Sequence, residues 1–265
     1  MLALYQYFGY DIPLRERFAL IKSSGFAAVG LWCDDWFGWT GHRAFAELAR
    51  AEGLQVIDGH APFSRDYDFV NAIWQDTQNG ETTFETYMRT INECGEDGIK
   101  NLIVHIEDEC SQPPNETGLL RLRRMTELAE QRGVTLALEN ITDYSYLSYV
   151  FERIDSPRVG FCYDAGHRNA NEPDIDHLSL FGNRLVALHL HDNDGTGDQH
   201  LLPGAGNIDW TERMAAIART GYTGPITLES TTGGPGTKSG AGDITAEQWL
   251  RDANAAATHL MELCR

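Results

Sequence analysis

Eight short apolar segments alternate with eight amphipathic segments along the chain, and this repeat constrains the fold more than any other feature. The apolar segments are rich in β-branched residues, as strands are, and lie at 2–7, 27–31, 54–59, 101–106, 134–138, 159–163, 185–190 and 225–228. The segments between them have helical periodicity and lie at 14–23, 42–51, 81–94, 116–131, 144–154, 175–181, 210–219 and 246–263. Alternating strands and helices indicate parallel βα units, and eight units predict an α/β fold, the (β/α)8 TIM barrel.

Glycines follow several predicted helices, at positions where a left-handed residue commonly ends a helix. They are Gly25, Gly53, Gly98, Gly133 and Gly221. A doubly wound open sheet is the alternative, but no Gly-x-Gly-x-x-Gly turn follows the first strand. No linker divides residues 1–265, although 231–242 is a glycine-rich loop. We therefore expect one TIM-barrel domain.

The chain is acidic, with 21 Lys and Arg against 39 Asp and Glu and a formal net charge of −18. This charge repels phosphate backbones and acidic membranes, so we expect no nucleic-acid partner. No apolar run approaches the roughly 18 residues of a membrane span, and residues 1–10 lack the features of a signal peptide. Five cysteines without a Cys-x-x-Cys pair indicate free thiols, which favours a cytoplasmic location.

Residues that commonly bind metals end most of the predicted strands. They are His60, His105, Glu139, Asp164, His191 and Glu229. In a TIM barrel these ends meet at one rim, where the active site lies. His167 follows Asp164 by three residues, and Asp198 and His200 lie in the loop after the seventh strand. These nitrogen and oxygen donors, without cysteine, favour Zn, Mn, Fe or Co over a thiolate site.

Two glutamates strengthen the metal hypothesis. A single His or Glu at a strand end is more often a hydrogen-bonded loop residue than a ligand. Glu139 and Glu229, however, each end an apolar strand, where an unpaired charge is costly. A bound cation would compensate both charges.

The remaining histidines receive other interpretations. His189 lies two residues before His191, so both point to the same side of a strand. We expect His189 deeper in the barrel, where it packs or supports a ligand. His42, His177 and His259 fall on predicted helices and are expected at the surface.

At these residues the chain resembles the xylose isomerase-like TIM-barrel superfamily, which contains sugar isomerases and epimerases as well as endonuclease IV. The matching stretches are Leu-Glu-Asn at 138–140, Asp-Ala-Gly-His at 164–167, His-Leu-His-Asp-Asn-Asp at 189–194, Asp-Gln-His at 198–200, Gly-Ala-Gly-Asn-Ile-Asp at 204–209 and Leu-Glu at 228–229. His-Ala-Pro at 60–62 and Val-His at 104–105 extend the likeness to the third and fourth strands.

The resemblance implies two ligand sets. Glu139, Asp164, His191 and Glu229 match the four ligands of the mononuclear ketose 3-epimerase site. Adding His60, His105, His167, Asp198 and His200 gives a pattern similar to the trinuclear zinc site of endonuclease IV. The resemblance therefore implies one to three divalent ions, with Zn or Mn favoured and Mg, Co or Fe as alternatives.

The activity implied is a metal-dependent isomerase or epimerase that acts on a small sugar or sugar derivative by proton transfer through a metal-stabilised enediolate. Glu139 and Glu229 would act as base and acid, and His167 would orient or protonate a substrate oxygen. One alternative is an endonuclease IV-like phosphodiesterase (AP endonuclease), which the net charge disfavours. Another is a sugar-binding barrel that retains metal without turnover, although the intact glutamate pair argues against it.

Residues for the sugar itself are harder to assign. Phe8, Trp32 and Trp36 follow or end the first two strands, where aromatic rings can stack on a sugar. Ketose 3-epimerases have a substrate-binding arginine six residues after the seventh-strand histidine, where this chain has Gly197, and Arg168 is the candidate replacement. A small-molecule sugar is the expected partner, and the resemblance makes a homodimer plausible.

Overall fold

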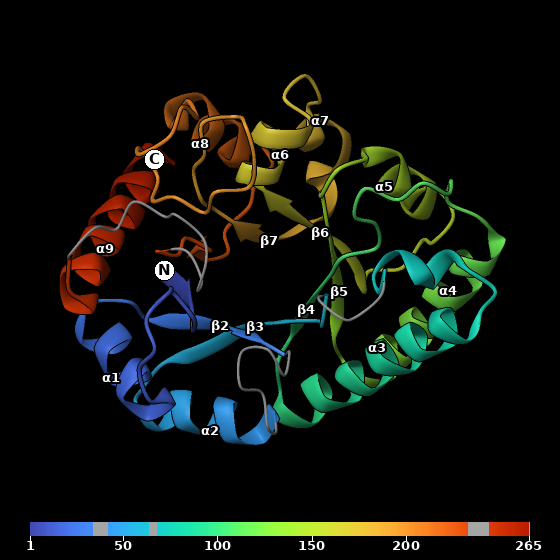
Figure 1. Ribbon diagram of the computed structural model, residues 1–265, viewed down its shortest axis with the longest axis horizontal. Coiled ribbons are helices and arrows are strands. Elements are labelled where there is room, and N and C mark those ends of the chain that lie inside the picture. The colour runs from blue at the N-terminus through green and yellow to red at the C-terminus, as the bar shows by residue number, and fades with distance from the viewer. Residues whose placement is uncertain (34–41, 64–67, 233–243, 265) are drawn as a thin grey trace.

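The computed structural model describes residues 1–33, 42–63, 68–232 and 244–264, and within them eight parallel strands form a barrel (Figure 1). The strands are β1 (Leu2–Tyr5), β2 (Ala28–Trp32), β3 (Gln55–His60), β4 (Asn101–Val104), β5 (Thr135–Glu139), β6 (Val159–Asp164), β7 (Leu185–His189) and β8 (Ile226–Leu228). They pair in the order β7-β6-β5-β4-β3-β2-β1-β8. A parallel bridge between Leu190 and Leu228 joins the two ends of this order, and Glu229 N donates to Leu190 O at 3.1 Å. The predicted (β/α)8 barrel is confirmed.

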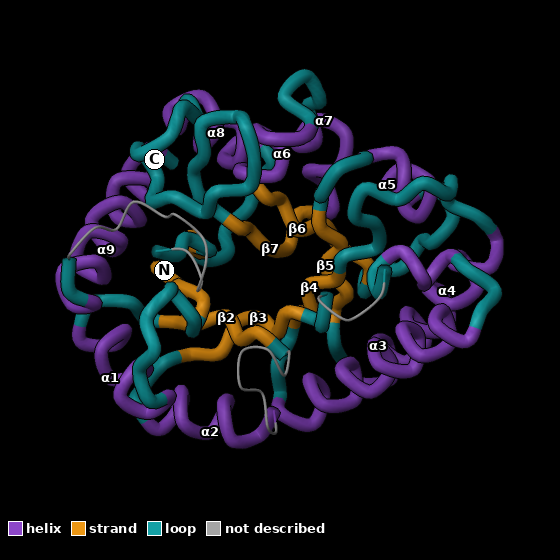
Figure 2. The backbone as a smooth tube through the Cα atoms, viewed as in Figure 1, coloured by secondary structure: helices purple, strands orange, loops and turns teal. Residues whose placement is uncertain are grey.

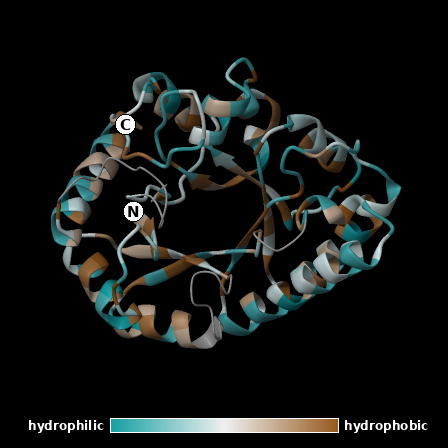
Figure 3. Cartoon of the chain, in the orientation of Figure 1, coloured by the Kyte–Doolittle hydropathy of each residue, from teal (hydrophilic) through white to brown (hydrophobic). Residues whose placement is uncertain are grey.

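Helices surround the barrel on the outside (Figure 2). They are α1 (Leu14–Ser23), α2 (His42–Ala51), α3 (Gln78–Asp97), α4 (Glu116–Arg132), α5 (Tyr144–Phe151), α6 (Ala165–Asn171), α7 (His177–Phe181), α8 (Trp210–Arg219) and α9 (Ala246–Leu263), with short 3-10 helices η2 (Asn71–Trp74) and η3 (Gly182–Arg184). Along these helices hydrophilic residues alternate with hydrophobic ones (Figure 3), as expected for helices with one packed and one exposed face. In the described segments none of the helices is long and apolar enough to cross a membrane.

Side-chain caps explain where several helices begin. Thr77, Asn115 and Asp209 each accept a hydrogen bond from the backbone N–H three residues later, at the starts of α3, α4 and α8. At the other end, Gly98 and Gly133 close α3 and α4 with φ of 68° and 69°, which other residues rarely adopt. The glycines that the sequence marked as helix ends therefore act as predicted.

The structure differs from the predicted elements near the rim. The first and fourth strands end two residues earlier than expected, at Tyr5 and Val104, which leaves His105 in the loop after β4. Helix α6 was not predicted. It begins directly after β6 because Asp164 caps it, accepting a hydrogen bond from His167 N at 2.6 Å. The strand end and the helix start thereby place two candidate ligands side by side.

Apolar residues lie in the barrel beneath the rim. Ile103, Ala137, Cys162 and Ala187 form a separate buried cluster on β4, β5, β6 and β7. Each lies two residues before a candidate site residue, and side chains two apart on a strand point to the same side. The candidate residues that end or directly follow these strands therefore point into the barrel above this apolar cluster. A larger hydrophobic cluster, which includes Phe18, Phe161 and Leu188, packs the helices against the strands.

Candidate active site

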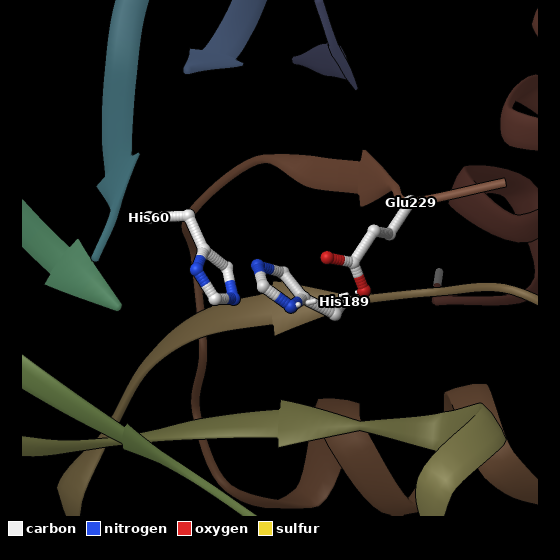
Figure 4. Close-up of side chains that lie close together, drawn as sticks. All are labelled: His60, His189 and Glu229. Atoms are coloured by element: carbon white, nitrogen blue, oxygen red, sulfur yellow. Dashed lines mark ion pairs between the residues drawn. The ribbon is translucent and has the colours of Figure 1, made fainter. Parts of the chain in front are cut away.

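Five buried side chains form what we call the inner cluster, at the ends of β3, β5, β7 and β8 and just after β4. They are His60, His105, Glu139, His189 and Glu229. Glu139 is at their centre: its Oε2 lies 3.1 Å from His105 Nε2 and 3.6 Å from His60 Nε2, and its Oε1 lies 2.9 Å from His189 Nδ1. Glu229 Oε2 approaches the same His189 nitrogen at 3.2 Å. Figure 4 shows His60, His189 and Glu229 pointing toward one another from three different strands.

The histidines control the charge of the two glutamates. Burial alone would raise the pKa of Glu139, but His189 and His105 hold that pKa well below its usual value. Burial likewise opposes ionisation of Glu229, yet His189 lowers its pKa to about 2. Burial lowers the pKa of His60, which favours the neutral imidazole. The inner cluster thus offers two carboxylates and a neutral imidazole, the forms in which these groups bind metal ions.

Five further side chains form the outer cluster, which lies at the end of β6, on α6 and in the loop after β7. They are Asp164, His167, His191, Asp198 and His200. His191 Nε2 lies 3.2 Å from Asp164 Oδ2 and 3.6 Å from Asp198 Oδ1. His200 Nε2 lies 2.9 Å from Asp198 Oδ2, and its ring stacks on His191 with centroids 4.0 Å apart. His167 links the clusters, since its Nδ1 is 3.4 Å from Glu139 Oε1 and its Nε2 is 3.5 Å from Asp198 Oδ2.

One buried carboxylate, that of Asp192, holds the loop that carries Asp198 and His200 of the outer cluster. Asp192 accepts hydrogen bonds from the backbone N–H groups of Asn193, Gly204 and Ile208 and from Trp210 Nε1, at 2.8 to 3.2 Å. Its backbone also pairs with Leu201 in both directions. Asp198 and His200 lie between these two anchors, so the loop is fixed at its base while they face the rim.

The four ligands that the ketose 3-epimerase resemblance implied belong to both clusters, and His167 Nδ1 lies 3.4 Å from Glu139 Oε1 and 3.7 Å from Asp164 Oδ1. Glu139 and Glu229 lie in the inner cluster, whereas Asp164 and His191 contact each other in the outer one. The histidine beside both glutamates is His189, because β7 ends at His189 and the chain has left the strand by His191. Sequence reasoning placed His189 deep in the barrel but missed its position between the two glutamates. The signal was present in the two-residue spacing, which makes either histidine a candidate.

Both clusters have the donor atoms of a cation site. His, Asp and Glu atoms within 4.8 Å of one another occur as His60, His189 and Glu229; as His60, His105 and Glu139; as Asp164, His167 and His191; and as His191, Asp198 and His200. Three of their buried polar atoms make no hydrogen bond within the described parts of the chain: His60 Nε2, His191 Nδ1 and Glu229 Oε2. Buried polar atoms are normally satisfied, so these three fit a bound cation.

The predicted sugar-binding residues fall in different places. Trp32 lies over the inner cluster, with its ring 4.5 Å from that of His60 and 5.4 Å from that of Phe63, a residue that sequence reasoning missed. Phe8 is fully buried and stacks on Trp249. Arg168 is turned toward the end of α6, where its Nε donates to Ile175 O at 3.4 Å. Trp36 lies outside the described residues.

Two of the three helical histidines can be placed. His259 is exposed as predicted. The prediction for His177 is wrong, because it is buried and its Nε2 lies 2.7 Å from Glu172 Oε2. That carboxylate also accepts from Tyr144 N, so the pair joins α7 to the start of α5. The side chain of His42 is outside the described residues.

The family model for the xylose isomerase-like TIM barrel matches residues 18–254 of this chain. The match spans all ten residues of the inner and outer clusters. The chain belongs to the xylose isomerase-like TIM barrel family. The resemblance drawn from the rim residues is therefore confirmed.

Relatives within this family cover most of the chain. The uncharacterized protein y4fM of Sinorhizobium fredii is 30% identical over 258 residues, 83% of this chain and 82% of that protein. Fructoselysine 3-epimerase of Shigella flexneri is 26% identical over 246 residues, 83% of this chain and 86% of the enzyme. The crystal structure of D-psicose 3-epimerase from Clostridium cellulolyticum H10 with D-tagatose has a TM-score of 0.79 and 16% identity, covering 100% of both chains. That structural likeness is one of fold.

Proposed function

We propose that this protein is a divalent-metal-dependent isomerase or epimerase of a small sugar or sugar derivative. The observation that carries the proposal is the placement of Glu139 and Glu229, two buried and ionised carboxylates that both approach His189 Nδ1 at the barrel rim. Two carboxylates that face one reacting carbon can remove a proton from one side and return it on the other. The sequence relationship to an enzyme named fructoselysine 3-epimerase supports the same reaction class.

The donor set fits a metal ion in the inner cluster, held by Glu139 and Glu229 with His189 and His60 as the nearest nitrogen donors. Such an ion would polarise a substrate carbonyl and thereby acidify the neighbouring C–H. Glu139 would accept the proton from that carbon and later release it to solvent, and Glu229 would take a proton from solvent and deliver it to the opposite side of the carbon. His167, within 3.4 Å of Glu139, orients or protonates a substrate oxygen. Zn and Mn suit these nitrogen and oxygen donors, with Co, Fe and Mg as alternatives.

Aromatic side chains offer a surface for the sugar beside this centre. Trp32 and the half-buried Phe63 pack together over His60, and Phe63 also lies 5.3 Å from the ring of His105. The C–H face of a sugar stacks well on such rings. We therefore retain Trp32 as a sugar-binding residue and add Phe63, whereas the buried Phe8 and the outward-turned Arg168 have no such surface in this proposal.

Metal binding and solvent exchange test the proposal together. Purified protein should carry at least about one divalent ion per chain by elemental analysis. Ketoses and aldoses are then incubated with the metal-loaded protein in deuterated water and followed by NMR. The substrate should gain deuterium at the carbon beside its carbonyl as its epimer or isomer forms. Protein that stays folded but binds neither Zn nor Mn would exclude the proposed function.

A phosphodiesterase of the endonuclease IV type is the second candidate. The observation that favours it is the outer cluster, which brings His167, Asp198 and His200 within reach of a further cation. Clustered ions can activate water and stabilise a leaving oxygen. The net charge of −18 disfavours a polyanionic substrate, so we rank this function below sugar isomerisation.

The remaining expectations follow from the proposed chemistry. A free sugar metabolite is the proposed partner, and a cytoplasmic setting suits an enzyme with five free cysteines. A homodimer stays a prediction. A metal-retaining sugar-binding barrel without turnover stays an alternative, and it requires Glu139 and Glu229 to be chemically idle.

A further inference from the structure

Asn193, a fully buried residue, connects helix α6 with the loop after β7. Its Nδ2 donates to Gly166 O at 2.8 Å, and its Oδ1 accepts from Gly195 N at 3.0 Å and from Asn169 Nδ2 at 2.8 Å. A carbonyl oxygen can only accept and a backbone N–H can only donate, so these partners leave one orientation for the amide. The side chain is therefore fixed by α6 on one side and by its own loop on the other.

Two further asparagines extend this link along the loop. Asn169 on α6 donates from Nδ2 to both Asn193 Oδ1 and Asn207 Oδ1, each at 2.8 Å. Asn207 donates from its backbone N to Asn193 O at 2.9 Å and from Nδ2 to Asp194 O at 2.8 Å. The segment 193–207, which carries two residues of the outer cluster, is thus held to α6 at both of its ends.

This link joins the two halves of the outer cluster. Gly166 lies between Asp164 and His167 in the chain, and Asn193 lies two residues after His191. Across the same junction His191 Nε2 lies 3.2 Å from Asp164 Oδ2, and the rings of His167 and His191 have centroids 5.8 Å apart. A Cβ on Gly166 would lie 1.9 Å from His191 Cε1, so α6 approaches the loop at a residue without a side chain. The hydrogen bond from Asn193 to Gly166 O connects the two backbones at this close approach.

We infer that Asn193 is a positioning residue that sets the distance between α6 and the loop after β7 and thereby holds His191 beside Asp164. The consequence for metal binding rests on the proposed function. Alanine at position 193 would remove three side-chain hydrogen bonds, among them the one to Gly166 O. A cation that takes donors from both halves, such as one held by Asp164 and His191, would then meet those donors at a different spacing. Asn193 itself touches neither the cation nor the sugar in this role.

Metal affinity separates this role from support of the fold alone. Asn193→Ala is compared with wild type and with Asn92→Ala, a matched control on α3 whose amide donates to Met88 O at 3.1 Å and accepts from Arg132 Nε at 2.7 Å. Titration calorimetry of the folded proteins with Zn²⁺ and the visible spectra of the Co²⁺-loaded proteins are the measurements. Asn193→Ala should bind at least one Zn²⁺ ion about 10- to 100-fold more weakly and shift the Co²⁺ bands, because residues outside the ligand set orient the ligands. The control should bind like wild type.

A measurement without metal distinguishes the failure of this inference from the failure of the proposed function. In the metal-free wild type the ring protons of His167 and His191 should show a nuclear Overhauser effect, which should weaken in Asn193→Ala and persist in Asn92→Ala. If wild type binds Zn²⁺ and Asn193→Ala matches its affinity, the inference is wrong while the proposed function stands. If wild type binds no metal, the proposed function fails and the ring contact decides: its loss in Asn193→Ala supports the positioning role, and its persistence overturns that role.

A second variant covers the case in which Asn193→Ala does not fold. Asn169→Ala removes the donor to Asn193 and Asn207, and alanine is a better helix former than asparagine on α6. Zn²⁺ binding weakened by about three- to tenfold would support the inference. Wild-type affinity in this variant would overturn it.

Discussion

The inner and outer clusters use similar residues but are built by different parts of the chain. All five inner residues end or directly follow barrel strands, and all five are at most 9% exposed. In the outer cluster, Asp198 and His200 come from a loop, and their side chains are 39% and 23% exposed. The barrel itself fixes the inner positions, whereas Asp198 and His200 depend on the hydrogen bonds of Asp192 at the base of their loop.

This difference indicates which of the two clusters is suited to proton transfer. A base must be held within hydrogen-bond reach of the proton it removes, and side chains on strands are held more tightly than side chains on loops. Glu139 is fixed by contacts to His105 and His189, while Asp198 contacts three histidines of the outer cluster, His167, His191 and His200. We therefore assign the chemistry to the inner cluster and a supporting role in metal or substrate binding to the outer one.

The largest expected effect compares one carboxylate from each cluster. Glu139→Gln should lower turnover at least about a hundredfold, because the amide keeps the size and one oxygen but cannot accept a proton. Glu229→Gln should do the same, whereas Asp198→Asn should cost less than about tenfold. Initial rates on the sugar identified by deuterium exchange are the measurement, with bound metal determined in each sample. Full activity in both metal-loaded glutamate variants would exclude their acid and base roles, and equal losses at Asp198 would make the two clusters one functional unit.

A stability effect should follow from Asp58, which lies on β3 two residues before His60 of the inner cluster. Asp58 is 2% exposed, accepts from Asn101 Nδ2 at 3.0 Å, and burial raises its pKa from 3.8 to about 6. Because the folded pKa is the higher one, the stability contributed by the protonated carboxyl is lost as pH rises from about 4 to about 6. Two pKa units correspond to about 3 kcal/mol. Asp58→Asn should therefore raise the free energy of unfolding at pH 8 by about 2 kcal/mol and change it little at pH 4.

Urea unfolding at both pH values tests this expectation. The exposed Asp174→Asn serves as the control and should leave the free energy of unfolding unchanged at either pH. A gain for Asp58→Asn at pH 4 as large as that at pH 8 would show that charge is not its source. A loss at both would mean that the carboxylate is required by the site above it.

The fold and the inner cluster could largely be predicted from sequence. Strand periodicity gave the eight units, and the residues that end the strands gave Glu139 and Glu229, because parity along a strand fixes which side chains enter a barrel. The same parity could not show whether His189 or His191 contacts the two glutamates, because both side chains point to the same side of β7. The answer depends on where the pairing of β7 with β6 ends. That boundary is set by tertiary contacts rather than by local sequence.

Other features had no local signal. Helix α6 is a single short segment started by the Asp164 cap, and its residues Gly166 and Asn169 are poor helix formers. His177 was expected at the surface because it lies on a predicted helix away from the rim, but Glu172 compensates its burial from five residues away. Tyr5 likewise carries no local signal, because only the pairing of β1 with β2 shows that Gly30 leaves room for its ring.

A smaller difference in metal affinity is expected between alanine substitutions at two glycines, Gly166 on α6 and Gly197 in the loop after β7. A Cβ on Gly166 would lie 1.9 Å from His191 Cε1, whereas nothing described lies within 4 Å of a Cβ on Gly197. Gly166→Ala should push the His191 ring out of place and weaken a second metal ion by about tenfold, while Gly197→Ala should bind like wild type. Co²⁺ titration with metal counting measures both. If Gly166→Ala weakens the first and tightest ion instead, His191 belongs to the primary site and the separation of the clusters is wrong.

The last test asks whether the outer cluster enables this protein to bind or cleave DNA, and we expect no effect. Three divalent ions would change the net charge of −18 only to about −12, which still repels a phosphate backbone. We expect no incision of an abasic-site duplex by protein loaded with Zn²⁺ or Mn²⁺, and no duplex binding whose affinity falls with salt. Fluorescence anisotropy across a salt series and gel analysis of the duplex are the measurements, with Asp198→Asn beside wild type. Incision by wild type that is lost in Asp198→Asn would reverse the comparison, because the chemistry would then belong to the loop-borne residues and Glu139 would serve chiefly as a ligand.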